Sequence, residues 1–444
     1  MEDLTTGSIS RHLLKTTGFM LVTMVFQTLY FLVDLYWVGR LGKEAIAGVG
    51  IAGNLTFIVL AITQMLGVGT TTLISHAAGR REQEEARLVL TQSLLLSAFI
   101  GAVFLILLTA LRGTYVGALS PDAMSAAAAN GYLSWFIPAM ALQFPMVVMA
   151  AALRGTGNFK PGMVVQTATV IINIVLAPAL MFGWLGTSPM GVAGAGLASF
   201  IAIIAGTIWL TFYFFATTAY LKLHPRLRPH AGMWGRVLKI GLPAGVEFAL
   251  IAVYLFVVYT ISRPFGAAAQ AGFGIGQRIV QAGFMPVVAL GFAVAPVAGQ
   301  NFGARKAERV RETFRRSLLM AASLTALFTA LCLFADEAMI AFFSSDPAVI
   351  AVGAEYLRII AWGTVASGIV FVNGSMFQAM GNTIPPLIAS FTRILIVAMP
   401  AILLSRAPGF ELRWVWYLSV AATLLQVGMN LLLLRREFRI RLAF

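Results

Sequence analysis

Charged residues and cysteine are scarce in this sequence of 444 residues. Only 11% of the residues are charged, whereas 59% are hydrophobic, and the mean hydropathy is +0.87. An ordinary soluble domain has about 25% charged residues, so this composition indicates an integral membrane protein. A single cysteine, Cys332, excludes an intrachain disulfide and a cysteine-based metal site. The four histidines lack metal-ligand spacing, so we expect no metal site.

Acidic residues are also few, with 17 Asp and Glu against 31 Lys and Arg and a net charge of +14. Such an excess of positive charge can indicate nucleic-acid binding, but these basic residues lie between apolar runs, so we expect no nucleic-acid partner. No Walker lysine follows the Gly-rich runs, which leaves ATP-driven transport unsupported. A membrane-embedded enzyme needs a cluster of histidines, carboxylates or a serine-base pair at one depth, and the sequence has none. We therefore expect neither an enzyme nor a cofactor.

Long apolar runs fill most of the chain, and each run of about 20 residues or more can cross a bilayer as a helix. The first run is too long for a signal peptide and should stay as a membrane helix. Continuous runs exclude a membrane β-barrel, which would alternate over about ten residues. The sequence thus predicts an all-α integral membrane protein with twelve transmembrane helices: roughly 13–38, 46–76, 88–111, 128–153, 161–184, 191–220, 237–262, 270–300, 313–335, 352–378, 384–405 and 412–434.

The basic residues between these spans favour one side of the membrane. With the amino terminus in the cytoplasm, 22 Lys and Arg residues fall in the inner loops and ends, against six in the outer loops. The positive-inside rule therefore places both termini in the cytoplasm, and we expect a multi-pass protein of a bacterial inner membrane.

The chain contains an internal repeat at a constant distance of 224 residues. The segment "GRREQEEARLVLTQSLLL" (79–96) aligns with "GARKAERVRETFRRSLLM" (303–320), and "LRGTGNFKP" (153–161) aligns with "FQAMGNTIP" (377–385). We predict two pseudo-symmetric six-helix bundles, residues 1–221 and 237–444, joined by a cytoplasmic linker at 222–236. An even number of spans gives both halves the same orientation, and two such bundles enclose a central cavity, which is a common transporter design.

A polar stripe follows the first span and ends in a carboxylate. Thr23, Gln27, Tyr30 and Asp34 are spaced by four, three and four residues, which puts them on one face of a helix. A polar stripe against lipid would cost several kcal/mol, so we expect it to face the bundle interior or a wet cavity. The alternative is that Asp34 caps an interfacial end of the helix, near the aromatic pair Tyr36 and Trp37.

Two further groups are candidates by position. Gln166, Thr169 and Asn173 form a second stripe in the fifth span, although a helix-packing hydrogen bond is an alternative role for Asn173. Glu247 lies eight residues after Lys239, about 12 Å deeper at 1.5 Å per residue, and is therefore near the middle of the bilayer. A carboxylate at that depth is a functional candidate.

The whole chain resembles the multidrug and toxic compound extrusion (MATE) family. The resemblance rests on "VDLYWVGRLG", "LRGTGNFKPG", "NIVLAP", "GVAGAGLAS" and "GQNFGARKAERV". It implies an exporter of amphipathic, often cationic compounds, driven by protons or sodium ions through alternating access. It also implies a cation-coupling role for Asp34, Asn173 and Glu247, with Ser199 lining the same pocket or serving as a small packing residue. Gln27, Tyr30, Gln166 and Ser199 are our candidates for substrate binding.

The sequence departs from the family pattern at one acid. The fifth span reads Asn173-Ile-Val-Leu-Ala177-Pro178, where the family usually has an aspartate at the position of Ala177. Asp34 is then the one deep carboxylate of the first half, which weakens a sodium site and favours a proton, because burial favours the neutral form of a carboxyl group. We predict a monomeric antiporter for drug-like compounds, coupled to H⁺ rather than Na⁺. A flippase for lipid-linked precursors or a polysaccharide exporter of the wider superfamily is the alternative.

Overall fold

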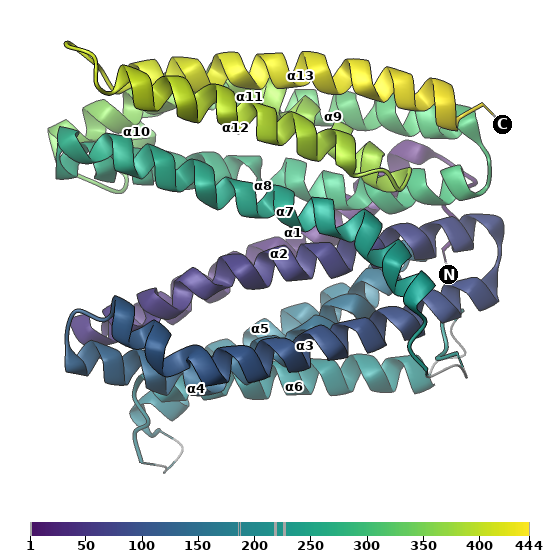
Figure 1. Cartoon of the computed structure of the whole chain (residues 1–444), viewed down its shortest axis with the longest axis horizontal. Helices are drawn as coiled ribbons and strands as arrows, with labels where there is room; N and C mark the ends of the chain where they lie inside the picture. Colours follow the sequence, from purple (N-terminus) through teal and green to yellow (C-terminus); the bar gives the residue numbers. More distant parts are fainter. Residues whose placement is uncertain (1, 185, 187, 217–219, 225–227, 444) are drawn as a thin grey trace. The chain divides into compact units, whose positions relative to one another are not determined.

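The described part of the chain is helical throughout. The computed structural model describes residues 2–184, 186, 188–216, 220–224 and 228–443. Among them, twelve helices are long and apolar enough to span a membrane, and no β-strand is present, which confirms the predicted fold class. The helices (Figure 1) are α1 (Ile9–Gly39), α2 (Lys43–Arg80), α3 (Gln83–Leu119), α4 (Ala123–Gly155), α5 (Phe159–Phe182), α6 (Val192–Ala216), α7 (Ala231–Ser262), the 3₁₀ turn η1 (Arg263–Phe265), α8 (Ala267–Gly303), α9 (Ala307–Phe334), α10 (Asp336–Ala341), α11 (Pro347–Ala379), α12 (Ile384–Leu404) and α13 (Arg413–Arg441).

Several helices run past the ends of their apolar runs. The third span was expected at 88–111, but α3 continues to Leu119, and the counterpart of this extension in the second half is the separate short helix α10. Polar helix ends that reach beyond the hydrocarbon region carry no hydropathy signal, which explains the short prediction. Residues 217–219 of the sixth predicted span and residues 225–227 of the predicted linker lie outside the described residues.

The chain divides into two compact units. Unit 1 is Met1–Asp3 with Phe19–Gly245, and unit 2 is Leu4–Gly18 with Val246–Phe444. Helices α1 and α7 each pass from one unit to the other along their length. The domain boundaries at 221 and 237 stay predictions.

The repeat reappears in the bounds and turns of the helices. Helix α4 begins at residue 123 and ends at 155, and α11 begins and ends 224 residues later, at 347 and 379. The left-handed residues that end α2 and α8 are Arg81 (φ 62°) and Arg305 (φ 56°), again 224 apart. Because a non-glycine residue rarely adopts positive φ, this shared feature indicates that both halves make the same turn.

Helices α4 and α11 begin with the same cap. Asp122 accepts a hydrogen bond from the backbone N–H of Ser125 at 2.8 Å, and Asp346 accepts one from Ala348 at 2.9 Å. These hydrogen bonds satisfy amides that a helix start leaves unpaired. The backbone N–H of Ser125 also lowers the pKa of the exposed Asp122 carboxyl, because it stabilises the charged form.

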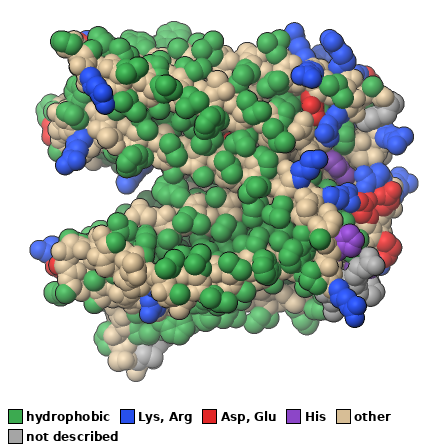
Figure 2. Space-filling model, viewed as in Figure 1, with side chains coloured by type: hydrophobic (Ala, Val, Ile, Leu, Met, Phe, Trp, Pro, Cys, Tyr) green, Lys and Arg blue, Asp and Glu red, His purple; other side chains and the backbone are tan. Residues whose placement is uncertain are grey.

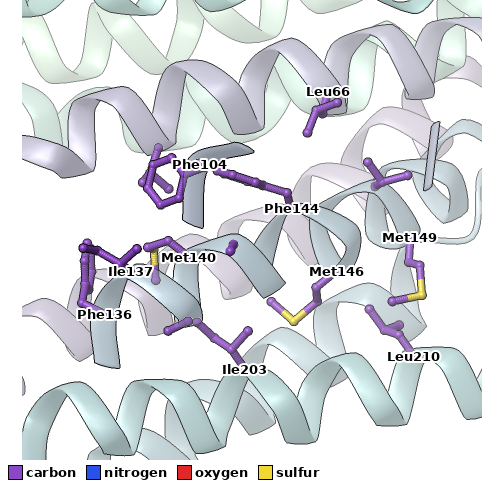
Figure 3. Close-up of a cluster of buried hydrophobic side chains, with 14 of the residues drawn as sticks. Leu66, Phe104, Phe136, Ile137, Met140, Phe144, Met146, Met149, Ile203 and Leu210 are labelled. Carbon is purple, nitrogen blue, oxygen red and sulfur yellow. The ribbon is translucent and has the colours of Figure 1, made fainter. Parts of the chain in front are cut away.

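Apolar side chains fill unit 1 around α4, which contacts α2, α3, α5 and α6. Figure 3 shows Phe144, Met146 and Met149 of α4 between Leu66 of α2 and Leu210 of α6. Hydrophobic side chains also cover the middle of the helices on the visible surface, and Lys and Arg lie at the helix ends (Figure 2). Phe212 and Phe256 are 70% and 72% exposed, as expected of residues that face lipid.

A short segment before α1 is fixed to unit 2. The backbone N–H of Leu4 donates to Gln300 Oε1 at 3.0 Å, and Asn301 Nδ2 donates to the Leu4 carbonyl at 3.1 Å. Lys306 Nζ donates to the Thr5 carbonyl at 2.9 Å, and the Leu4 side chain is fully buried. Extended backbone that forms no helix is thus satisfied by side chains of α8 and of the turn after it.

Candidate functional site

Unit 1 contains a cavity of about 290 Å³ between α1, α2, α4, α5 and α6. Such a volume lies near the lower end of the range for small-molecule pockets. The lining mixes apolar and aromatic groups with a few polar ones: Thr23, Gln27, Tyr30, Phe31, Asp34, Val49, Ala52, Gly53, Thr56, Val59, Leu60, Thr63, Tyr132, Phe136, Met140, Gln143, Met146, Gln166, Thr169, Val170, Asn173, Ser199, Ala202 and Ile203.

The polar stripe of α1 faces this cavity. Thr23, Gln27, Tyr30 and Asp34 all belong to the lining, so the helical spacing correctly predicted a shared face on a cavity. Gln166, Asn173 and Ser199 reach the same space from α5 and α6. The structure thus gathers six of the seven predicted site residues, and their roles in ion and substrate binding stay predictions.

Ser199 is the centre of the polar network in the cavity. Asn173 Nδ2 donates to Ser199 Oγ at 2.8 Å, Ser199 Oγ donates to the Ala195 carbonyl at 3.2 Å, and Tyr30 Oη lies 3.2 Å from Ser199 Oγ. A serine hydroxyl has one proton and two acceptor sites. Because its proton is directed to Ala195, Ser199 accepts from both Asn173 and Tyr30. The O–H of Tyr30 therefore points to Ser199 and away from Asp34.

Helix α6 can approach α5 this closely because its contact face is small. A Cβ atom at Gly206 would lie 2.5 Å from Thr169 Oγ1 and 3.0 Å from Met146 Sδ, so a larger residue would push α6 away from α4 and α5. The motif "GVAGAGLAS" of α6 supplies further small residues beside Ser199.

Asp34 has free acceptor capacity. Its Oδ1 atom is buried and has no hydrogen-bond partner within the described parts of the chain. An unpaired carboxylate oxygen in a membrane-embedded site is unfavourable, so this geometry calls for a proton or a cation. The network around Ser199 has the same consequence, because it uses the Tyr30 hydroxyl proton and an Asn173 N–H internally and leaves oxygen acceptors free.

Sequence reasoning missed the contribution of α4. Tyr132, Phe136, Met140 and Gln143 line the cavity from this helix, and the Tyr132 hydroxyl interacts with that of Tyr30. Their spacing of four, four and three residues was available as a signal. It was not used because this run is apolar almost throughout, so one mildly polar face does not stand out from the hydropathy pattern.

Glu247 lies on α7 in unit 2 and is not part of this lining. Ser390 Oγ of α12 donates to its Oε1 at 2.7 Å, and Gln426 Nε2 of α13 donates to Ser390 Oγ at 3.0 Å. Arg393, one turn after Ser390, has its Cζ 5.7 Å from the ring centroid of Tyr254. The side chain of Arg278 on α8 is exposed.

Duplicated bundles of membrane-spanning helices, with irregularly placed polar groups around an enclosed cavity, define a membrane transporter. The MatE family model matches the chain at residues 20–179 and again at 243–403, one match in each half of the repeat. The chain belongs to the MatE family, which confirms the resemblance seen in its motifs.

Relatives and a solved structure agree with this assignment. The chain is 27% identical over 410 residues to a probable multidrug resistance protein, YoeA, of Bacillus subtilis, covering 89% of this chain and 87% of YoeA. It is 26% identical over 377 residues to the probable multidrug resistance protein NorM of Thermotoga maritima, covering 85% and 81%. A structure described as the outward-facing conformation of a multidrug resistance MATE family transporter has the same fold, with a TM-score of 0.89, 22% identity and coverage of 99% and 98%.

Proposed function

We propose that the chain is a secondary antiporter that exports amphipathic, cationic organic compounds and is driven by inward flow of protons. The observation that carries this proposal is the chemistry of the unit 1 cavity. Its walls are aromatic and methionine-rich, Asp34 is its carboxylate, and the lining residues within the described chain include no Lys or Arg. A flat cationic molecule gains from aromatic faces and from the negative charge. The multidrug names of the relatives support the same substrate class.

Competition between the proton and the drug provides the coupling. Protonation of Asp34 removes the charge that attracts a cationic drug, and the Asn173 carbonyl oxygen and Tyr30 add neutral acceptors around a bound cation. The cycle requires the cation to bind two conformations with different affinity, because equal affinity would shift no equilibrium. Glu247 is a second coupling candidate, in unit 2.

Protons are favoured over sodium by the number of charged ligands. A sodium site takes several oxygen ligands and gains from more than one carboxylate, whereas Ala177 leaves this cavity with Asp34 alone. A lipid-linked precursor or polysaccharide exporter would need cationic side chains for phosphate groups, and the cavity lining offers none in the described residues. We place the protein as a monomer in a bacterial inner membrane with both termini in the cytoplasm, on the basis of its bacterial relatives and its basic loops.

Membrane vesicles with separately imposed gradients test the proposal. Ethidium transport should respond to a pH gradient and not to a sodium gradient, and Asp34→Asn should abolish the response. Asp122→Asn is the matched control, because it neutralises an exposed aspartate in the same unit while keeping a residue type that caps helices. Gradient-driven transport by Asp34→Asn at the wild-type rate would contradict the central role of Asp34. Loss of transport on removing only the sodium gradient would overturn proton coupling.

A further inference from the structure

Helix α13 carries a row of buried polar side chains in unit 2. Ser419, Thr423, Gln426 and Asn430 are spaced by four, three and four residues and share one face of the helix. Each is between 0 and 6% exposed. The row covers eleven residues, about 16 Å at 1.5 Å per residue. A face buried inside a membrane bundle is ordinarily apolar or small, so this row needs a chemical reason.

One part of the row is satisfied by protein groups and leads to Glu247. Ser419 Oγ lies 3.0 Å from Tyr254 Oη, and Thr423 Oγ1 donates to the Ser419 carbonyl at 2.8 Å. Gln426 donates to Ser390, and Ser390 donates to Glu247. With its proton on Glu247 and one acceptor site taken by Gln426, the Ser390 hydroxyl keeps one acceptor site free.

The other part of the row has no protein partner. The Nδ2 and Oδ1 atoms of Asn430 are buried and unpaired, and so are those of Asn373 on α11, which packs against α13. Both side chains are 0% exposed. Arg393 Nε on α12 is a fifth buried, unpaired polar atom in the described part of unit 2. Each unpaired group costs about 1–3 kcal/mol, so five of them would be a heavy burden without polar occupants.

The scaffold itself does not require these amides. In unit 1 the residues 224 positions earlier are Met149 and Gly206, in place of Asn373 and Asn430. Figure 3 shows Met149 packed beside Leu210 in that interface, which is filled by apolar side chains. The same helix pair therefore closes without polar groups in one unit and holds two buried amides in the other.

We propose that unit 2 holds a chain of buried water molecules, bound by Asn373 and Asn430, that carries protons to Glu247 through Ser390. Asn430 lies one turn beyond Gln426, about 6 Å along α13, a gap that one or two waters bridge at ordinary hydrogen-bond lengths. A buried water makes two to four hydrogen bonds, which suits two amides with both donors and acceptors.

The proton transfer balances without a further reactant. The Ser390 O–H bond breaks as its proton passes to Glu247 Oε1, and a water that donates to Ser390 gives it a new proton in the same step. That water is reprotonated by the next along the chain, and the last takes a proton from bulk solvent. The net change is one proton moved from solvent to the carboxylate. Arg393 is the charged group that faces Glu247 from α12, and Tyr254 lies on the same helix as Glu247.

Hydrogen–deuterium exchange of the Glu247 carboxyl group tests this proposal. The protonated carboxyl has an infrared band, which is assigned by its loss in Glu247→Gln, and its shift is followed after transfer of the detergent-solubilised full chain into D₂O. The double variant Asn373→Met/Asn430→Leu should slow this exchange about tenfold or more, because the proton must then wait for a local opening of unit 2. It should also raise the unfolding temperature, since unpaired polar atoms are removed. Thr325→Val, which removes a buried hydroxyl bonded within α9, is the control and should leave the exchange rate unchanged.

Two results would overturn the proposal: an unchanged exchange rate in the folded double variant, or the absence of any Glu247 carboxyl band across the pH range in which the protein is folded. If the double variant does not fold, radiolytic labelling of the wild type decides. Bound water should cause oxidation of the fully buried Met376, one turn from Asn373, but not of the equally buried Met181 in unit 1. No labelling of Met376 excludes the water chain.

The inference rests on the proposed function only for the use that the proton finds at Glu247. The exchange measurement needs no drug, so the two can fail separately. Slow exchange in the double variant together with wild-type ethidium efflux would keep the water chain and remove Glu247 from the coupling mechanism.

Discussion

Removal of the Ser199 hydroxyl is the most informative change to the unit 1 cavity. Ser199 Oγ accepts from Asn173 Nδ2 at 2.8 Å and lies 3.2 Å from Tyr30 Oη. Ser199→Ala leaves both donors without their acceptor. The Asn173 side chain is only 4% exposed, so its amide cannot turn to solvent, whereas the half-buried Tyr30 hydroxyl can turn into the cavity.

The expected loss of stability follows from these two environments. A buried donor left unpaired costs about 1–3 kcal/mol, and the Tyr30 hydroxyl should lose less than the Asn173 amide. We expect Ser199→Ala to lower the free energy of unfolding by about 2–4 kcal/mol in total. The measurement is unfolding of the purified protein in mild detergent by added denaturing detergent, followed by tryptophan fluorescence.

A second variant separates stability from function. Asn173→Val in the Ser199→Ala background removes the orphaned amide and should restore about 1–3 kcal/mol, because replacing both partners by apolar groups can be nearly neutral. Valine has a precedent in the repeat, since the buried Val397 stands 224 residues after Asn173. The double variant should be stable and yet fail to couple ethidium efflux to a pH gradient, because the Asn173 carbonyl oxygen is lost.

Two outcomes would refute this reasoning. Unchanged stability of Ser199→Ala would mean that the hydroxyl does not hold the network together. Wild-type, gradient-dependent efflux by the double variant would mean that the network does not serve the coupling cation.

Three further predictions concern packing and turns. A Cβ at Gly241 would lie 1.9 Å from a backbone carbonyl oxygen of α2, so Gly241→Ala should lower stability by about 1–3 kcal/mol or more, whereas Gly235→Ala on the same helix meets nothing within 4 Å and should be neutral in the same unfolding assay. Arg81→Gly and Arg305→Gly should each stabilise by about 0.5–1 kcal/mol and add together in the double variant, because glycine tolerates positive φ; a loss of stability would contradict the shared left-handed turn. Leu4→Ala should destabilise unit 2 by about 2–5 kcal/mol and speed proteolysis before α1; equal protease resistance would show that the segment is not held there.

Much of this molecule could be predicted from periodicity alone. Membrane helices must satisfy their backbone internally and face lipid, so long apolar runs and a constant 224-residue shift suffice for twelve spans and two halves. The α1 stripe was equally readable, because polar residues on one face of an apolar helix have few permitted environments. The contribution of Tyr132 and Gln143 was not, since α4 is buried on most sides and its apolar pattern has no preferred face. The division of α1 at Gly18 was also unreadable, because it depends on which neighbour each part packs against.

The two units share a scaffold and differ in the position of their carboxylate. Tyr30 and Tyr254 occupy equivalent places, and each lies beside a serine of the last helix of its unit. Asp34, however, corresponds to Val258, while Glu247 corresponds to Thr23, eleven residues earlier on the equivalent helix, or about 16 Å in depth. With both termini in the cytoplasm, as proposed, Asp34 lies nearer the outer surface and Glu247 nearer the cytoplasm. Two acids at different depths can exchange protons with different sides of the membrane, which identical halves could not do.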